Sequence, residues 1–282
     1  MARVLTLMLW LLMIKGCGGS GGDGPAAPSA GVDAEVAYGD EPLQYGQLRV
    51  PAGVGPFPLV VVIHGGCWLQ SVATLDYISP LAEALTDAGW ASYNIEYRSS
   101  DSSGGGWPGT FEDIAAAIDF TPMLAAAYNL DLSRLAVVGH SAGGHLALWA
   151  ASRNQLPPHS VLYRPQPVVP ATAVGLAAIT DLANYPQQNP SCGRPIAALV
   201  GQRPATPERL AETSPLAMGP AAAAVSLILG DRDRIVPLAQ AESYQRLSPQ
   251  TRLVTVSGDH FTLTNPQDQA FSALLAALNG GP

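Results

Sequence analysis

Cysteine and charge are both scarce in this chain, and each scarcity excludes a class of protein. Of the 282 residues, three are cysteines, Cys17, Cys67 and Cys192. That number is too small for a disulfide-built scaffold and no Cys-x-x-Cys pair indicates zinc, so we expect no metal and no cofactor. Charged residues make up 13% of the chain, with a net charge of −8 and no run of Lys or Arg. Because no basic surface can meet phosphates, we expect no nucleic-acid partner.

Apolar residues, by contrast, make up 48% of the chain, together with 29 glycines and 25 prolines. A chain of this length and hydrophobic content suits one α/β domain with a full core and long loops. The composition leaves the oligomeric state open.

The first 16 residues have the pattern of an export signal. Arg3 supplies a positive charge, and Val4–Ile14 is an apolar stretch of 11 residues, too short to span a bilayer. Residues 1–16 are therefore predicted to be a signal peptide. The protein is expected to be exported, either as a periplasmic protein or as a membrane-anchored lipoprotein.

Cys17 lies where a bacterial lipoprotein carries its lipid. The letters G-C-G-G-S at 16–20 resemble such a processing site, although Lys15 stands where a small or apolar residue is usual. We expect lipidation at Cys17, with cleavage nearby or a short retained anchor as the alternatives. Residues 17–31 are rich in Gly, Ser, Pro and Ala and are predicted to be a flexible linker, so the anchor would be the one membrane contact.

Residues 32–282 are expected to form the globular domain. Short β-branched runs alternate with helical stretches, which is typical of a mostly parallel sheet with helices on both faces. The expected strands are Glu35–Tyr38, Leu43–Val50, Leu59–Ile63, Trp90–Ile95, Leu135–Val138, Ala171–Ile179, Val225–Leu229 and Arg252–Val256, and the expected helices are Val72–Ala88, Thr110–Tyr128, Gly144–Ala150, Pro237–Leu247 and Pro266–Leu278. Residues 182–220 are rich in proline and have no regular period, and we expect a lid-like excursion over the carboxyl edge of the sheet.

The most informative stretch is the junction at residues 134–150. An apolar strand runs directly into Gly139-His140-Ser141-Ala142-Gly143, and a helix of small and apolar residues follows. Strand, tight turn and helix are the context in which a G-x-S-x-G match predicts a nucleophile elbow. Ser141 is therefore the candidate nucleophile, and the glycines allow the strand and the helix to pass closely.

A serine nucleophile needs a base, and one of the five histidines is well placed. His260 follows the last expected strand, at the same sheet edge as Ser141. His64 and His140 are expected to stabilise turns, and His145 to pack within its helix. For the acid that orients the base, chain order is compatible with three aspartates after strands, namely Asp181, Asp231 and Asp233.

Ester or amide cleavage also needs amide donors for the developing oxyanion, each worth about 3 kcal/mol of barrier. The turn His64-Gly65-Gly66 follows a central strand beside the elbow. The amides of Gly66 and Cys67 can point into the cleft, and the amide of Ala142 would be the second arm.

These motifs resemble those of α/β-hydrolases with an H-G-G oxyanion sequence, from about Glu41 onward. The chain is similar to kynurenine formamidase-like enzymes in two motifs, H-G-G-C-W (64–68) and G-H-S-A-G-G-H-L (139–146). It also resembles acetyl-xylan/feruloyl esterase-like enzymes in E-Y-R (96–98), G-G-W-P-G-T-F-E-D (105–113), G-D-R-D-R-I-V-P (230–237) and H-F (260–261). In the G-x-x-D-x-x-V-P pattern of that group the acid is the aspartate four residues before the proline, which implies Asp233 here. The resemblance implies an α/β-hydrolase fold and serine ester hydrolysis of a small-molecule substrate.

An arylformamidase or amidase on the same triad is the main alternative, and a peptidase a further one. Formamidases commonly carry an aromatic residue after H-G-G, where this chain has Cys67. A non-catalytic binding protein is disfavoured by the complete triad.

Two questions beside the triad stay open. Cys67 and Cys192 either pair in an exported protein or remain two thiols. Trp68 is a candidate substrate-binding residue, with ordinary packing as the alternative, and the same holds for Trp107 and Tyr185.

Overall fold

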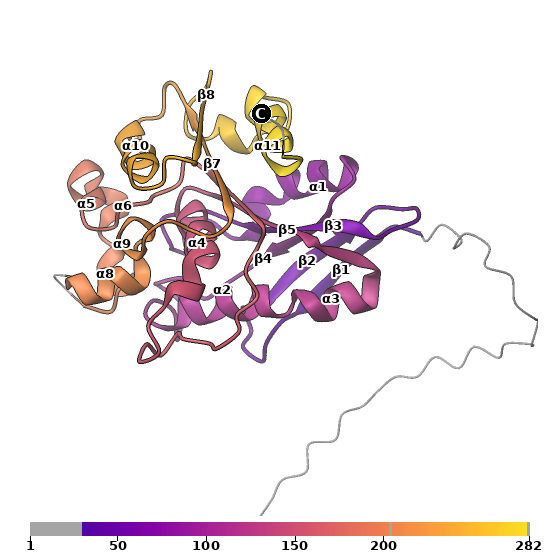
Figure 1. The fold of residues 1–282 in the computed structure, drawn as a ribbon, viewed down its shortest axis with the longest axis horizontal. Coiled ribbons are helices and arrows are strands. Elements are labelled where there is room, and N and C mark those ends of the chain that lie inside the picture. Colours follow the sequence, from indigo (N-terminus) through magenta and orange to yellow (C-terminus); the bar gives the residue numbers. More distant parts are fainter. Residues whose placement is uncertain (1–29, 203–204, 281–282) are drawn as a thin grey trace, which may run out of the picture.

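The computed structural model describes residues 30–202 and 205–280. Its strands are β1 (Val32–Ala37), β2 (Tyr45–Val50), β3 (Phe57–Ile63), β4 (Ala91–Ile95), β5 (Leu130–His140), β6 (Thr172–Leu176), β7 (Ala224–Gly230) and β8 (Arg252–Val256). They form one sheet in the order β1-β2-β4-β3-β5-β6-β7-β8 (Figure 1). The pairs β1–β2 and β2–β4 are antiparallel, and all neighbours from β4 to β8 are parallel, as expected for a mostly parallel sheet.

Helices cover both faces of this sheet, as predicted. They are α1 (Ser79–Asp87), α2 (Gly109–Asp119), α3 (Thr121–Tyr128), α4 (Ala142–Ser152), α5 (Tyr185–Gln188), α6 (Pro190–Gly193), α7 (Ile196–Leu199), α8 (Pro207–Thr213), α9 (Pro215–Met218), α10 (Leu238–Leu247) and α11 (Gln269–Leu278), with short 3-10 helices at Leu75–Ile78, Arg153–Gln155 and Thr262–Thr264. Figure 1 shows α1 and α11 on one side of the sheet and α2 and α3 on the other. Within the described ranges, no helix is long and apolar enough to cross a bilayer.

The centre of the sheet is the core of the domain. Every residue of Leu59–Ile63 on β3 is completely buried, because the strand is covered by helices on both faces and by a strand on each side. This is why a continuous β-branched run, rather than an alternating one, marks it in the sequence. Helix α4 packs on β5 and β6 and is buried along its whole length.

Two of the predicted helices differ from those in the structure. The expected Val72–Ala88 helix becomes a 3-10 turn followed by α1, which has a proline in its first turn. The expected Thr110–Tyr128 helix is two helices, because Pro122 has no N–H to continue the α2 ladder. The hydroxyl of Thr121 donates to the carbonyl of Ile118 at 2.8 Å at that break.

The segment 182–220, which joins β6 to β7, contains the short helices α5 to α9. None of these helices exceeds seven residues, which explains why the sequence shows no helical period there. Helix α9 packs against α4 and α10, so the segment is fixed to the body of the domain at that end.

Candidate active site

Ser141 occupies the turn between β5 and α4. Its backbone has φ 57° and ψ −116°, a conformation that residues with a side chain rarely adopt. Its N–H donates to the carbonyl of Leu176 at 2.8 Å. A Cβ on Gly139 would overlap the carbonyl of Gly143, and one on Gly143 would overlap that of Ile63. The turn is therefore a nucleophile elbow, and the crossing of strand and helix requires both glycines.

His260 and Asp233 form the hydrogen-bonded pair that a serine nucleophile needs. Nδ1 of His260 donates to Oδ2 of Asp233 at 2.8 Å, and both side chains are almost fully buried. The other carboxylate oxygen accepts from the N–H groups of Ile235 and Val236 at 2.7 and 2.9 Å. Burial raises the pKa of Asp233, but the hydrogen bond and charge of His260 together with these two donors outweigh it, so the pKa is lowered. Asp233 is thus held as a carboxylate.

The serine and the histidine meet in one cavity of about 150 Å³. Because Nδ1 of His260 is hydrogen-bonded to Asp233, Nε2 is the ring nitrogen that can accept the hydroxyl proton of Ser141. The lining comprises Gly66, Cys67, Val72, Ala73, Tyr77, His140, Ser141, Ile235, His260 and Phe261. The cavity wall is therefore mostly apolar apart from the candidate catalytic groups.

The other two candidate acids are engaged elsewhere. Asp231 accepts from the N–H of Gly258 at 2.9 Å and pairs with Arg232 at 3.3 Å. Asp181 caps the turn that follows it, accepting from the backbone of Ala183 at 3.0 Å. Of the three aspartates that chain order allows, Asp233 alone is hydrogen-bonded to His260.

The turn after β3 supplies the candidate oxyanion donors. Gly66, Cys67 and Trp68 have consecutive positive φ angles of 93°, 54° and 57°. Gly66 and Cys67 line the cavity that holds Ser141. Ala142 is the first residue of α4, so its N–H has no partner within the helix and is free to donate. The three predicted residues therefore border the nucleophile from two different elements.

A family model named BD-FAE matches residues 48–247 of the chain. The chain belongs to the BD-FAE family. Among curated relatives, it is 28% identical to "Esterase LipC" of Mycobacterium tuberculosis (strain ATCC 25618 / H37Rv) over 218 residues, which cover 74% of this chain and 53% of LipC. It is also 28% identical to that organism's "Probable carboxylic ester hydrolase LipM" over 200 residues, covering 67% of this chain and 44% of LipM. The chain thus spans about half the length of these relatives.

Solved structures with the same fold include esterases. A truncated carbohydrate esterase from gut microbiota superimposes with a TM-score of 0.72 at 22% identity, covering 92% of this chain and 99% of that one. Esterase B from Lactobacillus Rhamnosis gives a TM-score of 0.70 at 19% identity, covering 91% and 85%. These similarities confirm the α/β-hydrolase fold that the motifs imply.

Trp68 of this BD-FAE chain is buried, and the expectation that it contacts substrate needs correction. The residue has no exposed surface and is not part of the cavity lining. Its indole N–H donates to Nδ1 of His145 at 3.1 Å, and Nε2 of His145 donates to the carbonyl of Thr213 at 2.7 Å. Burial lowers the pKa of His145 to about 4, so the ring is neutral and can accept from the indole. Trp68 therefore anchors the oxyanion turn.

His140, the second residue of the elbow, is predicted to stabilise a turn, and in the structure it contacts the backbone of His260. Its Nε2 donates to the backbone carbonyl of His260 at 2.9 Å, and its Nδ1 accepts from the Tyr77 hydroxyl at 3.2 Å. Burial and the neighbouring His260 lower the pKa of His140 to about 3, which keeps the ring neutral. Tyr77 and His140 thus hold the backbone of the candidate base. The sequence carries no signal for this contact, because Tyr77 and His140 are 63 residues apart and no local pattern joins them.

His64, the first residue of the oxyanion turn, forms a buried pair with Glu96. Nε2 of His64 contacts Oε1 of Glu96 at 2.8 Å, and Oε2 of Glu96 accepts from the N–H of Leu75 at 3.1 Å. Arg98, two residues after Glu96, binds Asp113 at 2.6 Å. His64 and Glu96 follow neighbouring parallel strands, so their meeting at one sheet edge could have been inferred from strand order.

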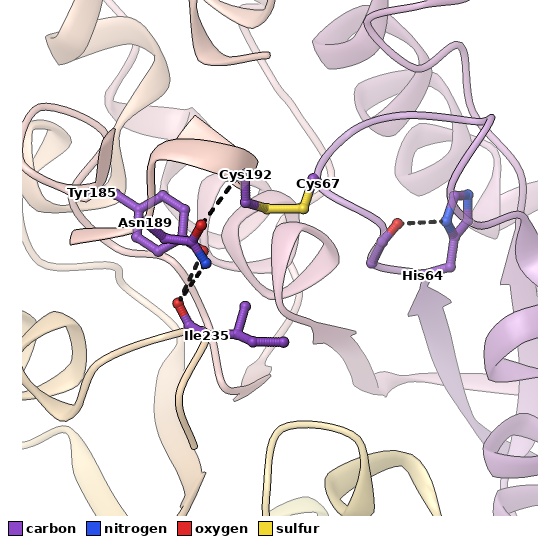
Figure 2. Close-up of a disulfide and its surroundings, with 7 residues drawn as sticks. His64, Cys67, Tyr185, Asn189, Cys192 and Ile235 are labelled. Atoms are coloured by element: carbon purple, nitrogen blue, oxygen red, sulfur yellow. Dashed lines mark hydrogen bonds between the residues drawn. A yellow bond between two sulfur atoms is a disulfide. The ribbon is translucent and has the colours of Figure 1, made fainter. Parts of the chain in front are cut away.

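The two cysteines of the globular domain, for which the sequence allows either a disulfide or two thiols, are paired. Cys67 and Cys192 form a disulfide, with Cα atoms 5.1 Å apart (Figure 2). Cys192 lies in α6 of the 182–220 segment, so the bond ties that segment to the oxyanion turn. Tyr185 is buried beside it and its hydroxyl donates to Ile235, rather than lining the cavity.

The N-terminal predictions fall outside this description. Cys17, the signal sequence at 1–16 and nearly all of the 17–31 linker lie beyond the described residues, which begin at residue 30.

Proposed function

We propose that this protein is a serine carboxylic-ester hydrolase that works through an acyl-enzyme. The observation that carries the proposal is that Ser141, on a strained elbow, shares one cavity with His260, whose Nδ1 is bonded to Asp233. Relatives named as an esterase and as a probable carboxylic ester hydrolase support the choice of ester as substrate.

In the acylation step, Oγ of Ser141 attacks the ester carbonyl while Nε2 of His260 takes its proton. His260 then gives that proton to the leaving alkoxide, which departs as the alcohol. Water attacks the acyl-enzyme with His260 again acting as base, and the carboxylic acid and free Ser141 are regenerated. Asp233 keeps Nδ1 protonated throughout, so that Nε2 is the nitrogen free to accept.

The tetrahedral oxyanion would accept hydrogen bonds from the N–H of Gly66 or Cys67 on one side and from the N–H of Ala142 on the other. A donor of this kind is worth about 3 kcal/mol, because it faces charge that develops only in the transition state. The strained turn at Gly66 and Cys67 supports this role, since strained backbone clusters where a site is preorganised.

The size of the cavity favours small acyl groups. Its volume of about 150 Å³ is well below the several hundred Å³ usual for sites that enclose drug-sized ligands. Tyr77, Ile235 and Phe261 form the apolar part of the wall. We expect acetyl and propionyl esters to be better substrates than octanoyl esters, as measured by kcat/KM across a p-nitrophenyl ester series.

A formamidase on the same triad is not favoured, because the curated relatives are esterases and Cys67 replaces the aromatic residue common after H-G-G in formamidases. Parallel assays with p-nitrophenyl acetate and N-formylkynurenine compare the two reactions directly. Preferential turnover of the formamide would refute the ester assignment.

We also propose that the protein is exported and anchored through a lipid on Cys17, with residues 17–31 as its tether. The support is the charged and apolar pattern of residues 1–16 and the glycine-rich sequence around Cys17. Radiolabelled fatty acid should enter the wild-type protein and not the Cys17→Ser variant. Equal labelling of the two proteins would refute the anchor.

The decisive test of the nucleophile is Ser141→Ala. Hydrolysis of p-nitrophenyl acetate should fall by about 10⁴-fold or more, and labelling by a fluorophosphonate probe should disappear. Ser133→Ala is the matched control, because Ser133 is exposed on β5 far from the elbow, and it should keep wild-type turnover. Retained turnover in Ser141→Ala would refute the proposal.

A further inference from the structure

The oxyanion turn adopts a backbone that its own residues do not favour. Cys67 and Trp68 both have φ near 55°, in the left-handed region, where a Cβ clashes with the backbone. Such a conformation persists only when the surroundings hold it. Two consecutive residues of this kind, next to a glycine at φ 93°, therefore need external restraints.

The two residues are held by different means. Trp68 is completely buried, its indole bonded to His145, and its carbonyl accepts from the N–H of Ser100 at 2.7 Å. Cys67 is half-buried, faces the cavity and makes no side-chain hydrogen bond with any described residue. The restraint on its side chain is the bond to Cys192, a residue 125 positions further along the chain.

The far end of the disulfide is itself well anchored (Figure 2). Cys192 is buried, and its N–H donates to Oδ1 of Asn189 at 3.2 Å. Nδ2 of Asn189 and the hydroxyl of Tyr185 both donate to the carbonyl of Ile235, each at 3.2 Å. The disulfide thus connects the oxyanion turn to the loop after β7.

That loop carries the candidate acid. The N–H of Ile235 donates to Oδ1 of Asp233 at 2.7 Å, and Ile235 is one of the residues that line the catalytic cavity. A continuous series of contacts therefore runs from Asp233 through Ile235, Asn189 and Cys192 to Cys67. It joins the acid to the oxyanion turn by a route that does not pass through Ser141.

From this arrangement we propose that the Cys67–Cys192 disulfide, supported by Asn189, is a positioning device for catalysis, and that the oxidised protein is the fully active form. The inference rests on the proposed esterase function. A dithiol that donates two electrons would cleave the S–S bond, leave two thiols and itself become a disulfide. The amide of Cys67 would then relax from its left-handed conformation, and the oxyanion would lose an aligned donor.

The first experiment compares oxidised and reduced wild-type enzyme on p-nitrophenyl acetate. Thiol counting follows reduction by dithiothreitol, and circular dichroism identifies conditions in which the reduced protein stays folded. We expect kcat to fall by about 10-fold or more with KM changed by less than about twofold, because the donor acts in the transition state. Reoxidation should restore kcat, and the double variant Cys67→Ala/Cys192→Ala should be slow and insensitive to dithiothreitol.

Two further variants separate positioning from general loosening of the fold. Glycine adopts positive φ readily, so Cys67→Gly should keep a higher kcat than Cys67→Ala although both lack the disulfide. Asn189→Ala leaves the disulfide intact but removes the hydrogen bonds of Asn189 to Cys192 and Ile235. It therefore tests the inference even when the reduced protein is too unstable to assay. It should lower kcat several-fold, whereas Asn154→Ala at an exposed position should not.

Equal kcat for folded oxidised and reduced wild type, or wild-type kcat in Asn189→Ala, would overturn the inference. Equal kcat in Cys67→Gly and Cys67→Ala would overturn its backbone argument. Failure of the proposed function has a different signature, because the oxidised wild type would then lack Ser141-dependent esterase activity altogether.

Discussion

At the scale of single residues, the candidate base is fixed from two sides. Its ring is held by Asp233 at 2.8 Å, and its backbone carbonyl by His140 at 2.9 Å. Because the pKa of His140 is lowered to about 3, the ring is neutral, so Nδ1 can accept from Tyr77 while Nε2 donates to His260. A charged His140 beside His260 would instead oppose the positive charge that His260 acquires during catalysis.

Removal of the Tyr77 hydroxyl should weaken this restraint. In Tyr77→Phe the ring still fills the cavity wall, but Nδ1 of His140 loses its donor. A hydrogen bond of this kind is worth about 0.5–1.5 kcal/mol, so we expect kcat to fall by roughly 2- to 10-fold with KM little changed. Steady-state kinetics on p-nitrophenyl acetate measure the effect. Tyr163→Phe is the control, and equal kcat in the two variants would contradict this role of Tyr77.

Residues whose roles depend on neighbours in the chain could be predicted from the sequence, whereas those that depend on distant partners could not. The elbow around Ser141 is local, and so is the spacing from Asp233 to Pro237. Trp68 is predicted to be a candidate substrate-binding residue with packing as the alternative, and in the structure its partner is His145 on α4. No local pattern indicates that contact.

At the scale of elements, the site depends on how closely α4 crosses β3 and β5. A Cβ on Gly143 would overlap the carbonyls of Ile63 and His64, which are backbone atoms and cannot rotate away. We expect Gly143→Ala to destabilise the protein by at least about 3 kcal/mol and to lower kcat, because the oxyanion turn begins at His64. Urea unfolding and kinetics on the folded fraction measure both effects.

Gly89→Ala is the comparison that separates steric overlap from backbone strain. Gly89 has φ 94° but nothing within 4 Å of an added Cβ, so alanine there should cost about 1–2 kcal/mol and leave kcat unchanged. A loss of stability in Gly143→Ala no greater than in Gly89→Ala would contradict the steric argument.

The order of the strands and helices can be predicted from the sequence, whereas the positions at which helices break can be predicted only in part. Continuous β-branched runs identified the buried strands, because both faces of a parallel sheet are covered. The break at Phe120 is not predicted, although Pro122 signals it, because the alanine-rich sequence continues on both sides. The helices of 182–220 were too short for any periodicity to detect.

At the scale of the whole molecule, the same buried histidines that order the site make stability depend on pH. The pKa of His145 is lowered by burial from 6.5 to about 4, and that of His140 to about 3. Between pH 6.5 and these values the unfolded chain binds protons that the folded protein does not. The stability that comes from keeping the rings neutral is therefore complete above pH 6.5 and is lost progressively as the pH falls toward 4 and 3.

His145→Gln should flatten this dependence. Glutamine can accept from Trp68 and donate to Thr213 as the neutral ring does, but it does not titrate. One proton fewer is then taken up on unfolding, so the fall in unfolding free energy between pH 6 and pH 5 should be smaller than in wild type by about 1 kcal/mol. Urea unfolding at the two pH values gives this difference. His159→Gln, at an exposed position, should match the wild-type slope, and an unchanged slope in His145→Gln would mean that the ring is already protonated in the folded protein at pH 5.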